Sequence, residues 1–124
     1  MGRVCELRNI LGEYFNWHKS RMDCFIQLLL GLFMVRTVNL KEIALSMTGS
    51  AQVDSHYRRL QRFLALFHID YTMIASWIFR LFFNADKKYY HCIDRTNWCW
   101  GKTAINVLML SIAYEGVAVP IFWK

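Results

Sequence analysis

A nearly unbroken apolar run over residues 105–114, followed at once by Glu115-Gly116, constrains the fold of this chain more than any other feature. Periodicity alone leaves such a run open to a helix or to a strand that is covered on both faces. The dipeptide Glu115-Gly116 favours the strand, because a two-residue turn before the valine-rich run 117–119 is typical of an antiparallel hairpin. Pro120 has no N–H for a strand ladder, so we expect the last strand to lie at the edge of its sheet.

A further strand is expected before this hairpin. Residues 89–93 are aromatic and apolar, and residues 95–102 read as a polar and aromatic turn. Strand alternation places Asp94 on the same face as Tyr90 and Cys92. The residues alone also allow a simpler role for Asp94, as a turn aspartate that caps the loop after it.

The chain before the sheet is helical in its apolar spacing. Ser20, Asn39 and Asp70 are placed to cap helices, and the last helix is apolar nearly all round, so we expect it to be buried. The expected helices cover residues 4–15, 21–36, 40–47, 51–67 and 71–83. A polar break follows at residues 84–88, and we expect a domain boundary there, between a helical domain of residues 1–86 and a sheet domain of residues 87–124. The expected fold class is therefore α+β.

The helices over residues 40–47 and 51–67 are joined by a short turn that contains Gly49, which is the helix-turn-helix pattern. The second helix has one apolar stripe, formed by Tyr57, Leu60, Phe63, Leu64 and Phe67. Its other side carries Ser55, Arg58, Arg59 and Arg62. Arginine can fork to a phosphate or to a guanine edge, so this side can lie against DNA. A solvated basic face on an ordinary core helix explains the same pattern, and both interpretations stay open.

Composition narrows the class of partner. The chain has 124 residues and a formal net charge of +6, which favours a polyanionic partner such as nucleic acid or an anionic membrane surface. The longest apolar stretches fall short of the roughly 20 residues that cross a bilayer, so we expect no membrane span and a cytoplasmic protein. The four cysteines lack the spacing of a zinc site, and we expect them to be reduced thiols.

Three blocks of the chain carry a family resemblance: residues 93–98 (Ile-Asp-Arg-Thr-Asn-Trp), the run 105–110, and residues 116–123. Together they resemble the start of the catalytic domain of bacterial insertion-sequence transposases of the DDE type. That domain has a ribonuclease-H-like fold, whose first three strands form an antiparallel meander. The arginine helix resembles the DNA-binding region that precedes this domain in the same family.

The resemblance implies a mechanism. In that family three acidic residues hold two divalent metal ions, usually Mg²⁺, which activate the attacking oxygen and stabilise the leaving oxygen of a phosphoryl transfer. The resemblance assigns Asp94 to the first catalytic and metal-binding position. It further implies duplex DNA of the element's terminal repeats as partner, with Asn97 and Lys102 as added DNA contacts. A homodimer and association with the nucleoid follow from the same resemblance.

The chain departs from the family in its acids. The second aspartate and the glutamate of the family lie beyond the third strand, and Glu115, the other acid of the sheet region, sits at the wrong end to reach Asp94. We therefore expect an N-terminal piece of a transposase that binds DNA, lacks two of the three acidic ligands and is inactive by itself. Two alternatives are a stand-alone helix-turn-helix regulator that competes with a full-length transposase, and a small membrane-associated protein.

Overall fold

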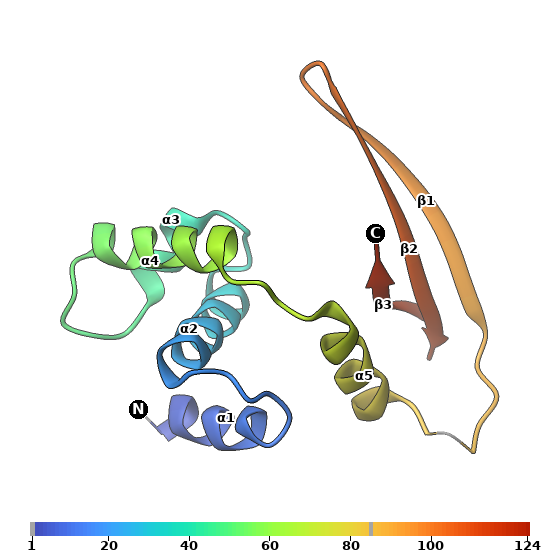
Figure 1. Cartoon of the computed structure of the whole chain (residues 1–124), viewed down its shortest axis with the longest axis horizontal. Coiled ribbons are helices and arrows are strands. Elements are labelled where there is room, and N and C mark those ends of the chain that lie inside the picture. Colours follow the sequence, from blue (N-terminus) through green and yellow to red (C-terminus); the bar gives the residue numbers. More distant parts are fainter. Residues whose placement is uncertain (1, 85) are drawn as a thin grey trace. The chain divides into compact units, whose positions relative to one another are not determined.

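The computed structural model describes residues 2–84 and 86–124, and its helices all precede an antiparallel sheet (Figure 1). The elements in chain order are α1 (Gly2–Gly12), α2 (Lys19–Val35), α3 (Leu40–Ser46), α4 (Val53–Leu66), α5 (Tyr71–Phe82), β1 (His91–Trp100), β2 (Thr103–Tyr114) and β3 (Val117–Trp123). The expected α+β class is confirmed. The five expected helices are present, and each begins and ends within a few residues of its expected bounds.

The contacts divide the chain into two compact units, residues 1–68 and residues 69–124. The boundary expected from the sequence lies after residue 86, so α5 was expected in the first unit but belongs to the second. The physical reason is that α5 packs against β3 and buries part of its apolar surface there. A helix that shares a core with a sheet belongs to the same unit as the sheet.

The first unit is held by a core that α1, α2, α3 and α4 supply together. Its least exposed side chains include Phe15, Ile26, Ile43 and Leu60. Trp17, in the segment between α1 and α2, extends this core. Its ring centroid lies 5.0 Å from that of Phe15, 5.2 Å from that of Phe25 and 4.9 Å from that of Phe67.

Helix starts follow the expected capping chemistry in two cases of three. Asn39 accepts from the Lys41 amide at 3.0 Å, and Asp70 accepts from the amides of Thr72 and Met73 at 3.0 and 3.2 Å. Ser20 is not a cap, because α2 begins one residue before it. His18 takes that position, and its Nδ1 accepts from the Ser20 amide at 3.3 Å.

The sheet of the second unit has the order β1-β2-β3, and both pairings are antiparallel. The central place of β2 and the edge place of β3, which carries Pro120, agree with the sequence. The Glu115-Gly116 turn is also confirmed, since φ is 48° at Glu115 and 82° at Gly116, the positive values that a type I′ hairpin turn requires. The pairing of β2 with β3 shifts register between Leu110 and Ser111.

The first strand is longer than the sequence indicates. We expected a turn over residues 95–102, but β1 pairs with β2 without interruption from His91 to Trp100. Only two residues turn, and Gly101, with φ of 59°, takes the place that type II′ turns give to glycine. The polar residues of β1 misled the expectation, because an exposed strand needs no apolar residues to pair its backbone.

Coverage of the second unit is also less than expected. The buried cluster is Phe83, Ile112 and Ile121, with α5 packed against it. None of the twelve residues of α5 is fully buried, and the expectation of a buried helix is wrong. Toward the other end of β2, Ile105 is 37% and Leu108 51% exposed, so β2 is central without being covered on both faces along its length.

The most apolar helices are α2 and α5, with 17 and 12 residues. Among the described residues, no single helix has both the length and the apolar composition to cross a membrane. The pair α2 and α3, which is bent by 101°, meets those two criteria only when both helices are counted together.

Candidate nucleic-acid interface

Helix α4 has two chemically different sides, as its sequence indicates. His56, Leu60 and Phe63 are buried, at the i, i+4 and i+7 positions of one face. Leu64 departs from the expected apolar stripe, since it is 51% exposed. Helix α3 packs against α4, and the connection between them, residues 47–52, contains Gly49 with φ of 136°.

The exposed side of α4 gathers four of the residues that the sequence singled out. Ser55, Arg58, Arg59 and Arg62 lie at i, i+3, i+4 and i+7, and they line one hollow of about 250 Å³. We call this the polar hollow. Its lining is one hydroxyl and three guanidinium groups, which is donor chemistry suited to an anion.

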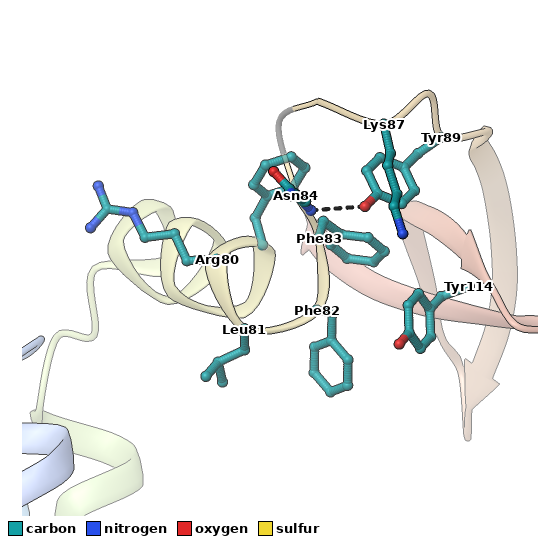
Figure 2. Close-up of a pocket in the computed structure, with 9 residues that line it drawn as sticks. Arg80, Leu81, Phe82, Phe83, Asn84, Lys87, Tyr89 and Tyr114 are labelled. Carbon is teal, nitrogen blue, oxygen red and sulfur yellow. Dashed lines mark hydrogen bonds between the residues drawn. The ribbon is translucent and has the colours of Figure 1, made fainter.

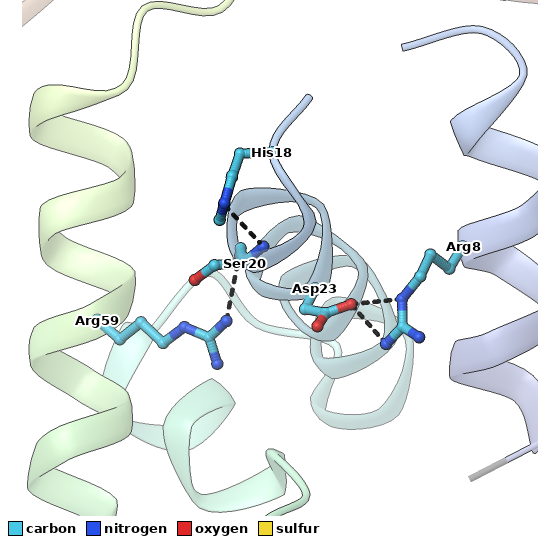
Figure 3. A network of polar contacts seen from close by, with 5 residues as sticks. All are labelled: Arg8, His18, Ser20, Asp23 and Arg59. Carbon is cyan, nitrogen blue, oxygen red and sulfur yellow. Dashed lines mark hydrogen bonds and ion pairs between the residues drawn. The ribbon is translucent and has the colours of Figure 1, made fainter. Parts of the chain in front are cut away.

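Arg59 has a second, structural contact. Its Nη2 donates to the carbonyl oxygen of Ser20 at 2.8 Å, which ties α4 to the first turn of α2 (Figure 3). On the other side of α2, Arg8 donates from Nε to Asp23 at 2.6 Å and forms an ion pair that ties α1 to α2. The three arginines of the polar hollow are therefore not equivalent, because Arg59 is half-buried and anchored whereas Arg58 and Arg62 are exposed.

The arginines of this surface form no ion pair with any described residue. Within residues 2–84 and 86–124, the one ion pair formed is that of Arg8 with Asp23, and Arg58, Arg59 and Arg62 have no carboxylate partner. Cations this close to one another repel, and a bound polyanion relieves that repulsion.

A second hollow, which the sequence did not predict, adjoins the first. It measures about 210 Å³ and shares Arg59 and Arg62 with the polar hollow; its lining is Ser20, Arg21, Cys24, Arg59, Arg62, Phe63, Leu66 and Phe67. We call this the amphipathic hollow. The guanidinium carbon of Arg21 lies 4.6 Å from the centroid of the Phe67 ring, a cation–π contact. One feature of the sequence could have indicated this hollow. Arg21 is a cation in the first turn of a helix, where the helix dipole disfavours positive charge.

Cys24 lines the amphipathic hollow from α2. Burial raises the pKa of its thiol, and the nearby Arg59 lowers that pKa by a smaller amount. The neutral thiol is thus an apolar part of the hollow rather than a nucleophile.

The residues predicted around Asp94 are not brought together. Asp94 is exposed in the middle of β1, opposite Met109. Asn97 lies three residues on and so points to the other face of the strand, and Lys102 lies in the turn beyond Trp100. Asp94, Asn97 and Lys102 all belong to the second unit, whereas the arginines of α4 belong to the first.

The two metal ions implied by the family resemblance need several hard oxygen ligands. In the part of the chain that the structure describes, no group of three or more His, Cys, Asp or Glu side chains could hold a metal ion. Asp94 by itself does not supply the set of oxygen ligands that a divalent cation needs.

A third hollow, of about 590 Å³, lies in the second unit where α5 ends (Figure 2). Aromatic rings dominate it, among them Phe83 and Tyr114, and the Tyr89 hydroxyl accepts from the Asn84 amide at 2.8 Å. Arg80 points away from these rings, and Lys87 lies close to them. The described lining contains no carboxylate, thiol or imidazole, and its titratable side chains are Arg80, Lys87, Tyr89 and Tyr114.

Comparison with known protein families, with curated proteins and with solved structures finds no match for this chain.

Proposed function

We propose that this chain is a DNA-binding protein of the DDE transposase type, whose helix-turn-helix of α3 and α4 contacts the terminal repeats of a mobile element. The observation that carries the proposal is the polar hollow, where Ser55 and three arginines without acidic partners share the exposed side of α4. The net charge of +6 adds long-range attraction to a polyanion.

Arg58 and Arg62 are the main duplex contacts of this proposal, and Arg59 lines the same hollow while it holds α4 in place through Ser20. Contacts from these side chains to phosphates would supply affinity, and a fork to a base edge would supply specificity. The same proposal includes a homodimer that binds paired repeats, and association with the nucleoid.

The catalytic part of the proposal is limited to position. Asp94 stands where the family has its first acid, on the first strand of a ribonuclease-H-like sheet, and Asn97 and Lys102 are added DNA contacts. We propose DNA binding, not strand transfer, as the activity of this chain.

A second candidate function is a stand-alone regulator that binds the same repeats and competes with a full-length transposase. It is favoured by one observation: residues 1–68 form a compact unit that contains both hollows. A regulator needs no sheet.

The test is a titration of fluorescently labelled duplex DNA, followed by anisotropy at several salt concentrations. We expect Arg58→Gln and Arg62→Gln to weaken binding several-fold each. Each should also reduce the slope of log Kd against log salt by about 1 for every phosphate that the variant no longer neutralises. Arg3→Gln, an equal change of charge on α1, is the matched control. Variants that bind as tightly as the unchanged chain would refute the proposal.

The two candidate functions differ in the contribution of the sheet. Lys102→Gln in the full chain should weaken duplex binding if the sheet takes part, as in a transposase. An unchanged affinity favours the regulator.

A further inference from the structure

The amphipathic hollow has a chemistry that duplex binding does not use. Its cations, Arg21, Arg59 and Arg62, line the same space as the apolar side chains of Phe63, Leu66 and Phe67. A phosphate contact needs only the cations. The apolar side chains suit a flat, weakly polar group that arrives together with a phosphate.

The position of Arg21 indicates that this flat group is a nucleobase. Its guanidinium lies over the Phe67 ring, and Arg21 is itself exposed and lines the hollow. Arginine planes and aromatic rings are the side chains on which unstacked nucleobases are held. Phe67 also makes a T-shaped contact with Trp17, with ring centroids 4.9 Å apart, which helps to hold the Phe67 ring in place.

Size and continuity favour a single base with its neighbouring phosphate. The amphipathic hollow, at about 210 Å³, is below the roughly 300–1,000 Å³ of sites for drug-sized ligands. It shares Arg59 and Arg62 with the polar hollow, so a phosphate between these two arginines has a cationic site on one side and an apolar site on the other.

We propose that the amphipathic hollow between α2 and α4 binds one unpaired nucleotide of a DNA strand, its base against the exposed Arg21 guanidinium that lies over Phe67 and its phosphate at Arg59 and Arg62. This inference rests on the proposed DNA binding and deepens it: the preferred ligand is duplex DNA that carries an unpaired segment. A base within an intact duplex is stacked on both faces and cannot reach such a platform.

The test compares two DNAs, a mixed-sequence duplex and the same duplex extended by a short unpaired strand that contains 2-aminopurine. Anisotropy gives both dissociation constants, and quenching of the 2-aminopurine fluorescence reports stacking of the unpaired base. We expect the extended DNA to bind about tenfold tighter than the paired duplex, with quenching on binding.

The variants Arg21→Gln and Phe67→Leu should bring this ratio of affinities close to one. Phe67→Leu keeps an apolar side chain against Trp17, and the exposed Arg21→Gln removes no buried contact, so one of the two keeps the test valid if the other fails to fold. Arg3→Gln, the matched removal of one charge, should leave the ratio unchanged.

The outcomes separate this inference from the proposed function. Equal affinity of the unchanged chain for the two DNAs, with the paired duplex bound, overturns the unpaired-nucleotide site and leaves duplex binding in place. A tenfold preference that survives in both variants also overturns it. Failure to bind either DNA overturns both proposals.

Discussion

Arg59 shows how one residue type takes two roles on the same helix. Its neighbour Arg58 is exposed, whereas the Arg59 guanidinium donates to the Ser20 carbonyl oxygen at 2.8 Å and so links α4 to α2. Three arginines on one face look alike in the sequence. Only the surroundings in the structure show that Arg59 also anchors α4 to α2, whereas Arg58 makes no such contact.

We predict that Arg59→Gln lowers the free energy of unfolding by about 1 kcal/mol, because the Ser20 carbonyl oxygen loses a charged donor. Arg58→Gln should change it by less than about 0.5 kcal/mol, as expected for an exposed side chain without a partner. Urea unfolding followed by circular dichroism measures both. Equal effects of the two variants would contradict the anchoring role.

At the scale of the element, α2 and α3 approach one another closely because of Gly31. A Cβ atom at this position would lie 2.7 Å from Ile43 Cγ2 and 3.0 Å from Ser46 Oγ. Ile43 is fully buried and β-branched, so it has little freedom to move away.

Gly31→Ala should therefore destabilise the first unit by about 1–3 kcal/mol through overpacking, despite the better helix propensity of alanine. Gly12→Ala is the control, since a Cβ there meets nothing within 4 Å. We expect Gly12→Ala to leave the midpoint of thermal unfolding unchanged or to raise it. A stabilising Gly31→Ala would show that α3 can shift at no cost.

The β2–β3 turn is a second element whose geometry conflicts with one residue. Glu115 has φ of 48°, a left-handed value that residues other than Gly, Asn and Asp rarely adopt. Asn-Gly is the preferred pair for a type I′ turn.

Glu115→Asn should accordingly stabilise the second unit by about 0.5–1 kcal/mol. Lys102→Asn in the other hairpin is the control, because Lys102 does not have a positive φ and gains nothing from the change. Hydrogen exchange of the sheet amides reports the difference. A neutral Glu115→Asn would show that this hairpin does not limit the stability of its unit.

For the whole molecule, the division after residue 68 has a practical consequence. Residues 1–68 retain the packing of α1 to α4, whereas residues 1–86 include α5 without the sheet that covers part of it. Exposed apolar surface of that kind promotes association.

We predict that residues 1–68 are monomeric and unfold cooperatively, and that residues 1–86 associate at protein concentrations at which residues 1–68 remain monomeric. The full chain should also associate, because Ile93, Trp98 and Trp100 of β1 are 73%, 58% and 70% exposed and β1 is a sheet edge. Sedimentation velocity over a concentration series measures all three. A monomeric full chain would mean that the exposed strand β1 does not mediate association.

The sequence predicted much of the local structure, because local structure depends on spacing and caps. The five helices, the edge place of the strand with Pro120, the Glu115-Gly116 turn and the caps at Asn39 and Asp70 all follow from residues close together in the chain. It also predicted that Ser55, Arg58, Arg59 and Arg62 share one side of α4, since a helical repeat places them there. Their role in DNA binding, and that of Asp94 in a transposase, stays a prediction.

Contacts between distant segments decided the rest. That α5 belongs with the sheet, that β1 extends through Trp100, and that Arg21 and Phe67 complete a hollow with Arg59 could not be read from spacing. Each depends on which surfaces meet in three dimensions, where burial and pairing override the polarity of a local segment. The amphipathic hollow joins residues 46 positions apart in the sequence, from Arg21 to Phe67, and only the packing of α2 against α4 brings them into one site.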